Sequence, residues 1–391
     1  MVQLYGENLT RTGLAACSGA LSQFAGVRLV TLADGVERGI RMLEFRTGTG
    51  LRFTVLVDRA MDIAEVEHRG RAVGWHSPTG FRNAALHEYE GEDGLAWARS
   101  FSGFLVTCGL DHILGPQEVP AETYNYPGKQ TTRHALHGRI GTIPAQLTGY
   151  GERWERDRCF LWAEGVVKQA TVFGENLLLH RRIEAEVGTD DIILSDRVVN
   201  AGFLTTPHMF FYHINIGHPV LDAGSRYLAP ISDVVWAVHA DRYRTQQVGY
   251  HTAPAPTCGF AEQVWQHEMS ADPQGEVPVA LVNDRLGFGI EVTTRKDQLP
   301  CAYQWQYFQS GAYVMGMEPS THHVLGNRAA RDRGEMIWLG PQEQRRYGAR
   351  FRILDGAAAI AASQSRIETI ARQPTDDFPT PSGRFLPLTG R

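Results

Sequence analysis

The chain has 391 residues, of which 43% are hydrophobic and 21% are charged, and 43 acidic against 38 basic residues give a formal net charge of −5. This composition is typical of a globular protein and excludes a disordered or collagen-like chain. The mildly acidic balance argues against nucleic acid or an anionic membrane as partner, since both require a dense basic surface. We expect one large domain over 1–391, with an N-terminal extension at 1–38 and a C-terminal tail at 374–391.

Neither a membrane segment nor an export signal is predicted. The chain contains no run of about 20 apolar residues. Its N-terminus has Glu7 before any basic residue and no unbroken apolar stretch, unlike a signal peptide. The cysteines are far apart and form no Cys-x-x-Cys pair, which favours reduced, buried thiols in a cytoplasmic protein over disulfides or structural zinc. They are Cys17, Cys108, Cys159, Cys258 and Cys301.

Strand patterns dominate the chain. Residues 39–46 and 51–57 alternate apolar and polar side chains around the turn Thr47–Gly50, which predicts a β-hairpin with one buried face. Similar short patterns follow at 160–167, 171–175, 177–187, 192–200, 210–216, 287–293, 312–317 and 345–354. Their spacing predicts an all-β fold, a large antiparallel β-sandwich, rather than βαβ units. The few short helices are expected at 8–24, 82–88 and 355–373.

Three segments are expected to be irregular. Residues 115–132 are polar and rich in proline and glycine, and a loop of that length often forms part of a binding rim. Residues 335–344 contain Gly340-Pro341 and are expected to be extended or loop. The tail from Pro374 is expected to lie on the surface or to fray.

Three histidine-containing segments are candidates for proton transfer, because histidine is the side chain whose ordinary pKa lies near neutrality. They are 134–139 (HALHGR), 208–218 (HMFFYHINIGH) and 318–323 (EPSTHH). The last begins with a carboxylate that ends a strong strand pattern directly before a proline. Such a stiff backbone can hold Glu318 toward the concave face of a sheet.

Side chains of these kinds are what a sugar site in a β-sandwich requires. A carboxylate can take a hydroxyl proton and an imidazole can deliver a proton to the ring oxygen, while aromatic rings cover the apolar faces of the sugar. Aromatic residues are frequent in the neighbouring segments: Trp75, Phe210, Phe211, Tyr212, Tyr303, Trp305, Tyr307 and Phe308.

The order of these segments resembles that of the aldose 1-epimerase (galactose mutarotase-like) superfamily, in particular its poorly characterised domain-of-unknown-function branch. The pattern is a His-Gly pair, then a strand with His-Ile-Asn, then a late strand that ends in Glu-Pro. The resemblance runs from about Gly39 to Leu354. It rests on four blocks in shared order and spacing: 57–81 (VDRAMDIAEVEHRGRAVGWHSPTGF), 107–116 (TCGLDHILGP), 134–141 (HALHGRIG) and 315–322 (MGMEPSTH).

The resemblance implies an open sugar-binding groove on one curved sheet and no cofactor. It implies that His137 binds near the ring oxygen, that His213 is the general acid for that oxygen, and that Glu318 is the general base on the anomeric hydroxyl. Ring opening, rotation about the C1–C2 bond and reclosure would then invert the anomeric centre. A positioned acid or base typically contributes about 10²–10⁴-fold, and a pKa raised by burial would suit Glu318.

The chain departs from the family where classical members bind the sugar. It has His137-Gly138-Arg139 where they have His-Gly-Gly, and the block 107–116 lacks the arginine that they carry there. His112, Arg139 or Arg59 could take over that contact. An exchange of this kind favours a sugar that is acidic, modified or otherwise different from galactose. Asp284 is a candidate for the family's substrate-binding aspartate. The residues expected to contact the sugar are Arg59, His112, His134, Arg139 and Trp305.

Each assignment has a structural alternative. His137 could be a loop histidine held by backbone groups, His213 a strand histidine bonded to a carbonyl, and Glu318 half of a strand-end salt bridge. His134 could orient His137. Arg59 and Asp62 could line the groove, or they could form an internal ion pair that locks two strands. Trp75 and Trp305 could belong to the core, and His208, His218 and His323 are expected to be structural.

Two other functions remain open at this stage. A metal-dependent sugar isomerase or lyase could use His134, His137, His213 and Glu318 as ligands for a divalent metal. A non-catalytic carbohydrate-binding protein could use the same groove. In each case the expected partner is a small sugar, and the N-terminal segment and long loop could supply a homodimer contact.

Overall fold

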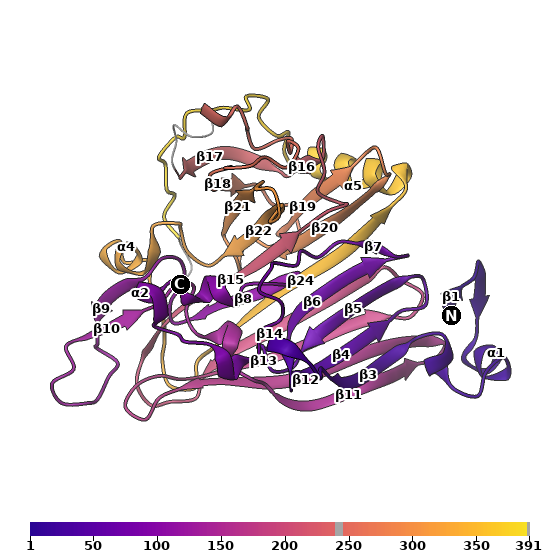
Figure 1. Cartoon of the computed structure of the whole chain (residues 1–391), viewed down its shortest axis with the longest axis horizontal. Helices are drawn as coiled ribbons and strands as arrows, with labels where there is room; N and C mark the ends of the chain where they lie inside the picture. The colour runs from indigo at the N-terminus through magenta and orange to yellow at the C-terminus, as the bar shows by residue number, and fades with distance from the viewer. Residues whose placement is uncertain (239–244, 389–391) are drawn as a thin grey trace.

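Antiparallel sheets form most of the molecule in the computed structural model (Figure 1), which describes residues 1–238 and 245–388. The largest sheet has eight strands. Their order is β11 (Gln146–Glu155), β12 (Arg158–Ala170), β13 (Asn176–Glu186), β14 (Asp191–Asn200), β24 (Gln344–Asp355), β20 (Phe288–Arg295), β19 (Glu276–Asn283) and β16 (Arg226–Leu228). Burial alternates along β12 and β13, so each strand turns one face to the core, as the sequence pattern predicts.

A second sheet of seven strands carries the candidate site. Its order is β17 (Ile231–Ala237), β18 (Gln263–Met269), β21 (Cys301–Tyr307), β22 (Val314–Ser320), β15 (Thr206–Ile216) and β23 (Ile337–Leu339), and β8 (Leu105–Leu110) also pairs with β15. Every residue of β15 and β22 is buried. Both faces of these strands are therefore covered, which explains their nearly continuous apolar sequence.

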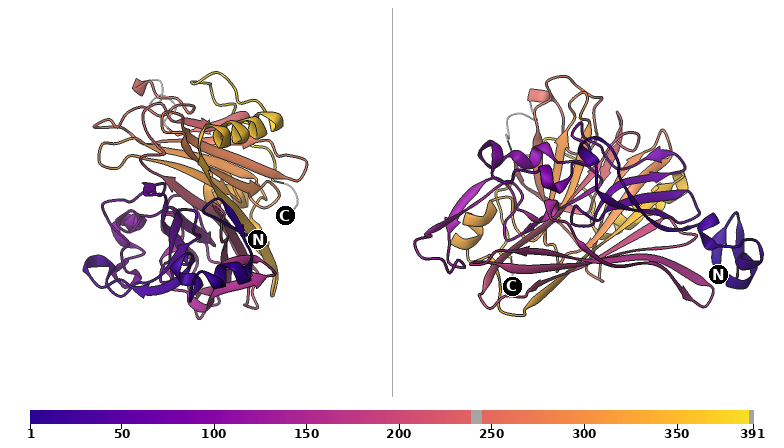
Figure 2. Two further views of the ribbon diagram at one scale, coloured as in Figure 1. Left: turned by 90° about the vertical axis from the view of Figure 1, so that its right-hand side faces the viewer. Right: turned by 60° about the horizontal axis from the view of Figure 1, so that its bottom comes forward.

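A third sheet of five strands comes from the N-terminal part of the chain, drawn in indigo and purple in Figure 2. It contains β3 (Gly26–Thr31), β4 (Arg41–Arg46), β5 (Leu51–Leu56), β6 (Asp62–His68) and β7 (Arg71–Ala72). Two ribbons complete the strands: β1 (Val2–Leu4) with β2 (Glu7–Leu9), and β9 (Gln117–Pro120) with β10 (Thr131–His134). The predicted hairpin is confirmed as β4 and β5.

Short helices connect and cover the sheets. They are α1 (Arg11–Ala16), α2 (Gly91–Gly94), α4 (Gly326–Asp332) and α5 (Ala357–Ile370), with 3₁₀ turns at η1 (Leu21–Gln23), η2 (Gly35–Glu37), η3 (Ala84–Leu86), η4 (Ala96–Arg99) and η5 (Ile140–Thr142). Helix α5 packs on β19, β20 and β24 (Figure 2). No helix in the described ranges combines the length and apolarity that crossing a bilayer requires.

Three predicted elements were wrong in extent. The helix expected at 8–24 is divided into β2, α1 and η1: α1 begins after Thr10, whose side chain accepts a hydrogen bond from the Gly13 N–H, and it ends before Gly19. The segment 171–175 is a turn and not a strand, closed by a hydrogen bond from the Thr171 N–H to the Glu175 carbonyl. The helix expected at 82–88 is only the short turn η3.

Other expectations agree with the structure. The all-β prediction is confirmed, and the helix expected at 355–373 is α5. The segment 335–344 is extended where it forms β23. The long loop 115–132 is closed at its base by the β9–β10 ribbon. The tail, described to residue 388, packs along β17 and α4, where Arg384 pairs with Asp233.

A buried ion network joins the five-stranded sheet to the eight-stranded sheet. Arg181 on β13 binds Asp62 on β6 (2.7 Å) and Asp196 on β14 (2.6 Å). Thr107 donates to Asp62 and Tyr212 donates to Asp196. Asp62 is therefore part of an internal network and not a lining residue of a groove.

Candidate functional site

Strand alternation divides the side chains of β15 between two environments. Phe210, Tyr212 and Ile214 point into the main core, whereas Phe211 points into a second cluster on the other face. His213 shares the face of Phe211. This second face is where the candidate site lies.

The β15–β22 register brings His213 and Glu318 together. Ile214 pairs with Met317 on these antiparallel strands. His213, which precedes Ile214, therefore lies opposite Glu318, which follows Met317. Nε2 of His213 lies 3.2 Å from Oε1 of Glu318. These two side chains are only 4% and 5% exposed.

His137 approaches the pair from the loop that follows β10. Its ring centroid lies 5.8 Å from that of His213. The Leu114 N–H donates to Nδ1 of His137 at 3.3 Å, so the neutral ring carries its proton on Nε2. His137 and His213 are 76 positions apart in the chain, and His213 and Glu318 are 105 positions apart. The fold therefore brings three distant residues together.

Two glycines make this approach possible. Gly138 has a φ of +76°, and a Cβ at this position would lie 2.2 Å from the Gly109 carbonyl oxygen. Only glycine therefore fits after His137. On β22, a Cβ at Gly316 would lie 2.6 Å from Oε1 of Glu318, so this glycine leaves room for the carboxylate.

Aromatic rings cover the three residues. Trp97 and Phe101 stack on each other with centroids 4.1 Å apart. Trp97 lies 4.5 Å from the ring of His137, and Phe101 lies 4.7 Å from that of His213. Trp305 lies 5.2 Å from His213. His137 and Trp305 are partly exposed, so solvent reaches the site on their side.

Arg59 holds the loops around the site rather than facing a sugar. The side chain is buried and donates to the carbonyl oxygens of Gly141 (3.0 Å), Arg82 (3.1 Å) and Ser100 (2.8 Å). Ser100 lies between Trp97 and Phe101 in the chain, so Arg59 ties the aromatic wall to the segment that follows His137. The expectation that Arg59 binds the sugar finds no support in this geometry.

Burial controls the protonation of the pair. Burial raises the pKa of Glu318 well above its ordinary value, and the carboxylate of Glu262 raises it further. Burial lowers the pKa of His213 to about 3 and that of His137 well below its ordinary value. Burial therefore favours the neutral form of the carboxyl group and of both imidazoles. Oε1 of Glu318 accepts no well-aligned hydrogen bond from the described residues.

A second polar cluster lies beside the site. The rings of His112 and His134 stack in parallel with centroids 4.8 Å apart, and Nδ1 of His134 lies 3.9 Å from Oδ2 of Asp111. Gln169 donates to the other oxygen of Asp111 at 2.8 Å. His134 thus faces Asp111 and His112, and not the His213–Glu318 pair.

Arg139 belongs to the same cluster. Its Nη1 lies 3.4 Å from Oε1 of Glu175, and its guanidinium lies 4.5 Å over the ring of Tyr89. Asp111 and Glu175 raise the pKa of Arg139 against the effect of burial. The arginine that replaces the second glycine of the family motif is therefore neutralised by carboxylates of its own chain.

Two further candidates from the sequence find no support in the structure. Within residues 1–238 and 245–388, no group of three or more His, Cys, Asp or Glu side chains is arranged to hold a metal ion. Asp284 lies at the surface, where it forms an ion pair with Arg226 at 2.6 Å. It does not contribute to the site.

Comparison with known proteins places this geometry in a family. The model of a domain of unknown function, DUF4432, matches residues 37–353. The chain belongs to the DUF4432 family. No curated protein matches this DUF4432 chain significantly.

Solved structures share the fold of this DUF4432 chain. A Klebsiella pneumoniae subsp. pneumoniae protein provisionally named an aldose 1-epimerase is 25% identical with a TM-score of 0.80, over 88% of this chain and 87% of that one. A galactose mutarotase-like protein from Clostridium acetobutylicum is 11% identical with a TM-score of 0.55, over 84% and 98%. Galactose 1-epimerase from Lactobacillus acidophilus NCFM is 13% identical with a TM-score of 0.51, over 84% and 99%. The predicted galactose mutarotase-like fold is confirmed.

Sequence reasoning missed three residues of the site in this DUF4432 member. Trp97 and Phe101 lie in a segment without a strand pattern, so no periodicity drew attention to them. Glu262 lies just before β18, where Oε2 accepts a hydrogen bond from Nε1 of Trp305 at 3.1 Å. No motif marks these positions, and only the folded chain brings them to Glu318.

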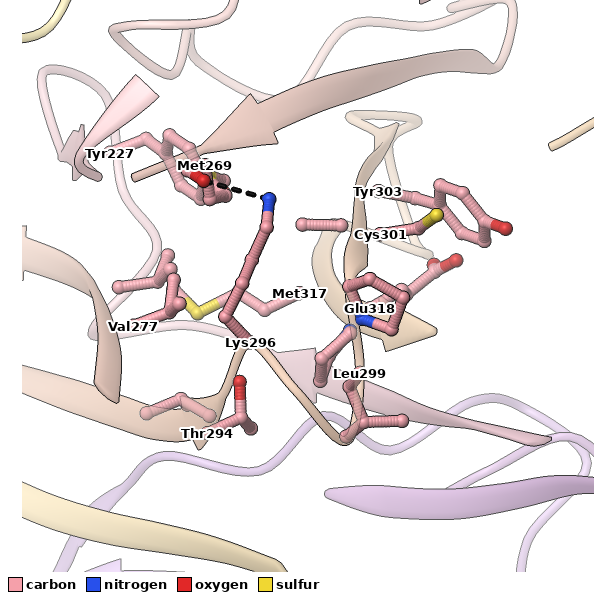
Figure 3. Close-up of a pocket in the computed structure, with 15 residues that line it drawn as sticks. Tyr227, Met269, Val277, Thr294, Lys296, Leu299, Cys301, Tyr303, Met317 and Glu318 are labelled. Atoms are coloured by element: carbon pink, nitrogen blue, oxygen red, sulfur yellow. Dashed lines mark hydrogen bonds between the residues drawn. The ribbon is translucent and has the colours of Figure 1, made fainter. Parts of the chain in front are cut away.

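A separate pocket lies behind β22. Its lining is mostly apolar and includes Met317, Leu299 and Val277, with Lys296 at one side. In Figure 3 the Lys296 ammonium donates to the Met269 carbonyl, and the carboxylate of Glu318 points away from Lys296. Met317 and Glu318, neighbours on β22, both contribute to this lining.

Proposed function

We propose that the protein is a carbohydrate-active isomerase of the aldose 1-epimerase type, which interconverts the anomers of a sugar by acid–base ring opening and reclosure. The observation that carries this proposal is the contact between Nε2 of His213 and Oε1 of Glu318 at 3.2 Å, with His137 beside it. A proton acceptor and a proton donor within one contact distance are what opening of a cyclic hemiacetal requires.

The pair carries one exchangeable proton. Burial favours the form that has this proton on Glu318, because burial disfavours both charged forms. Transfer across the contact gives an ionised Glu318 and a protonated His213. In that form Glu318 takes the proton of the anomeric hydroxyl and His213 delivers its proton to the ring oxygen. Reclosure on the other face of the carbonyl reverses both transfers and restores the pair.

The surroundings support the reaction in two further ways. Nε2–H of His137 is available to donate to a sugar oxygen, since Nδ1 already accepts from the backbone of Leu114. Trp305 presents a partly exposed aromatic ring against which an apolar sugar face can pack. Neither role requires a metal or an organic cofactor.

Anomer exchange tests the proposal directly. Freshly dissolved pure anomers of several aldoses are followed by polarimetry and by proton NMR with the wild-type protein and with Glu318→Gln. We expect acceleration by the wild type and a loss of about 10²–10⁴-fold in the variant. Glu155→Gln, an exposed change on β11, serves as the matched control.

Two results would contradict the proposal. Equal rates for wild type and Glu318→Gln would remove Glu318 from the reaction. Binding of aldoses in a saturation-transfer experiment without any acceleration of anomer exchange would indicate a sugar-binding protein instead. Because His213 and Glu318 are almost completely buried, sugar binding alone does not show that the sugar reaches them. Binding and anomer exchange are therefore measured separately.

A further inference from the structure

One exposed carboxylate borders the candidate site. The carboxylate of Glu262 is exposed, and Nε1–H of the Trp305 indole donates to it at 3.1 Å. We call these two side chains the Glu262–Trp305 rim. Glu262 is close enough to Glu318 for its charge to affect that carboxyl. Glu318 itself is buried, and its Oε1 has no well-aligned hydrogen-bond partner among the described residues.

Among residues 1–238 and 245–388, no lysine or arginine balances the Glu262 carboxylate beside Glu318. In the described part of the chain, no lysine or arginine shifts the pKa of Glu318, His137 or His213. Two arginines of the surrounding loops are already engaged: Arg139 with the carboxylate of Glu175, and Arg59 with backbone carbonyls. A carboxylate or phosphate on the sugar would therefore meet repulsion from Glu262 and no counter-charge from the described residues.

The rim is also aromatic. Trp305 lies 5.6 Å from Phe101 and 6.3 Å from Trp75, and these two rings lie 5.2 Å apart. Aromatic faces attract cations, and they attract ammonium groups most strongly where a carboxylate is close and water is partly excluded. Rings and carboxylates together form a setting that favours a positively charged ligand.

We propose that the substrate is an amino sugar whose protonated amine binds at the Glu262–Trp305 rim. This inference rests on the proposed function, because it assigns the substrate class of the same site. It narrows the sequence-based expectation of an acidic or modified sugar to a modified sugar with a positive charge, because Arg139 is engaged by Glu175. Glu262 is then a specificity residue: it recognises the charge of the substrate and takes no part in the proton transfers.

The test compares sugars that differ in charge. Binding is measured by competition in saturation-transfer NMR and turnover by anomer exchange, for glucosamine, galactosamine, mannosamine and 6-amino-6-deoxyglucose, with glucose, N-acetylglucosamine and glucuronate as neutral and acidic counterparts. We expect at least one amino sugar to exceed its neutral counterpart by about tenfold, with glucuronate weakest. Raised salt should reduce this preference.

Glu262→Gln gives the decisive comparison. We expect the preference for the amino sugar over glucose to fall about fivefold, while Glu155→Gln, which removes the same charge from β11, leaves it unchanged. An unchanged preference in Glu262→Gln, or equal handling of glucuronate and the amino sugars, would overturn the inference. Both outcomes are independent of Glu318→Gln, whose effect on anomer exchange decides the proposed function separately.

Discussion

Two neighbouring residues of β15 face two very different buried polar groups. Tyr212 points to the network of Arg181, Asp62 and Asp196, in which the guanidinium binds both carboxylates. His213, on the other face, meets Glu318, and no lysine or arginine of the described residues shifts the pKa of either group. A buried network with all partners in place stabilises a fold, whereas an uncompensated acid beside uncompensated imidazoles costs stability and is typical of a functional site.

The largest expected loss of stability comes from removing the guanidinium of Arg181 from its network with Asp62 and Asp196. Arg181→Met leaves Asp62 and Asp196 buried without their cation, and we expect the free energy of unfolding to fall by about 3–5 kcal/mol. Urea denaturation followed by circular dichroism measures the change. Arg182→Met on the same strand, whose side chain is partly exposed, is the control and should cost far less. Similar losses in both variants would show that the network has no special role.

Arg59→Lys tests whether Arg59 holds the loops around the site in place. A lysine cannot reach all three carbonyls that Arg59 binds, so a loss of about 1–3 kcal/mol is expected from unsatisfied buried groups. The fluorescence of Trp97 should also change, because Ser100 is no longer fixed. A variant with wild-type stability and wild-type emission would contradict the positioning role.

Acid should destabilise the protein through its buried histidines. Burial lowers the pKa of His213 and His112 to about 3 and that of His267 to about 4. The unfolded chain therefore binds more protons between about pH 6.5 and these values, and stability must fall as the pH falls through this window. Melting temperatures at pH 7, 6, 5 and 4 measure the slope, and His267→Gln should make it shallower. A melting temperature that is constant from pH 7 to 4 would refute this.

The smallest expected effect is the pH dependence of stability that comes from Glu318. It is opposite to that of the histidines, because it lowers stability as the pH rises. Because the pKa of Glu318 is raised in the folded state, its contribution to stability is complete at low pH and is lost as the pH rises through that pKa. Glu318→Gln keeps the shape without the titration. Its melting temperature relative to wild type should therefore increase between pH 5 and pH 9, by a few degrees. A difference that does not vary with pH would show that Glu318 titrates normally.

The sequence predicts the sheets better than it predicts the site. Alternation along 39–57 and 160–200 is a local property, so the strands could be located from it. The helix at 8–24 was wrong because the Thr10 cap and the glycines that follow limit α1 to a short element. Burial of both faces of β15 depends on the other sheet and on the loop at 84–104, which no local pattern reveals.

Some residues of the site could be identified from the sequence, whereas the contacts of others depend on the folded chain. His137, His213 and Glu318 were identified from the family resemblance, and the structure brings them together. The contacts of Arg139 with Glu175 and of Arg59 with carbonyls depend on residues up to 82 positions away, so their charges appeared free in the sequence. The aromatic wall and Glu262 were invisible for the same reason.

The central claim is that His213 and Glu318 act as one unit in proton transfer. Anomer-exchange rates of wild type, His213→Gln, Glu318→Gln and the double variant test it most directly. If the pair shares one proton, each single change removes nearly the whole acceleration and the double variant is no slower than either. Independent effects, with the two losses multiplying in the double variant, would contradict this account.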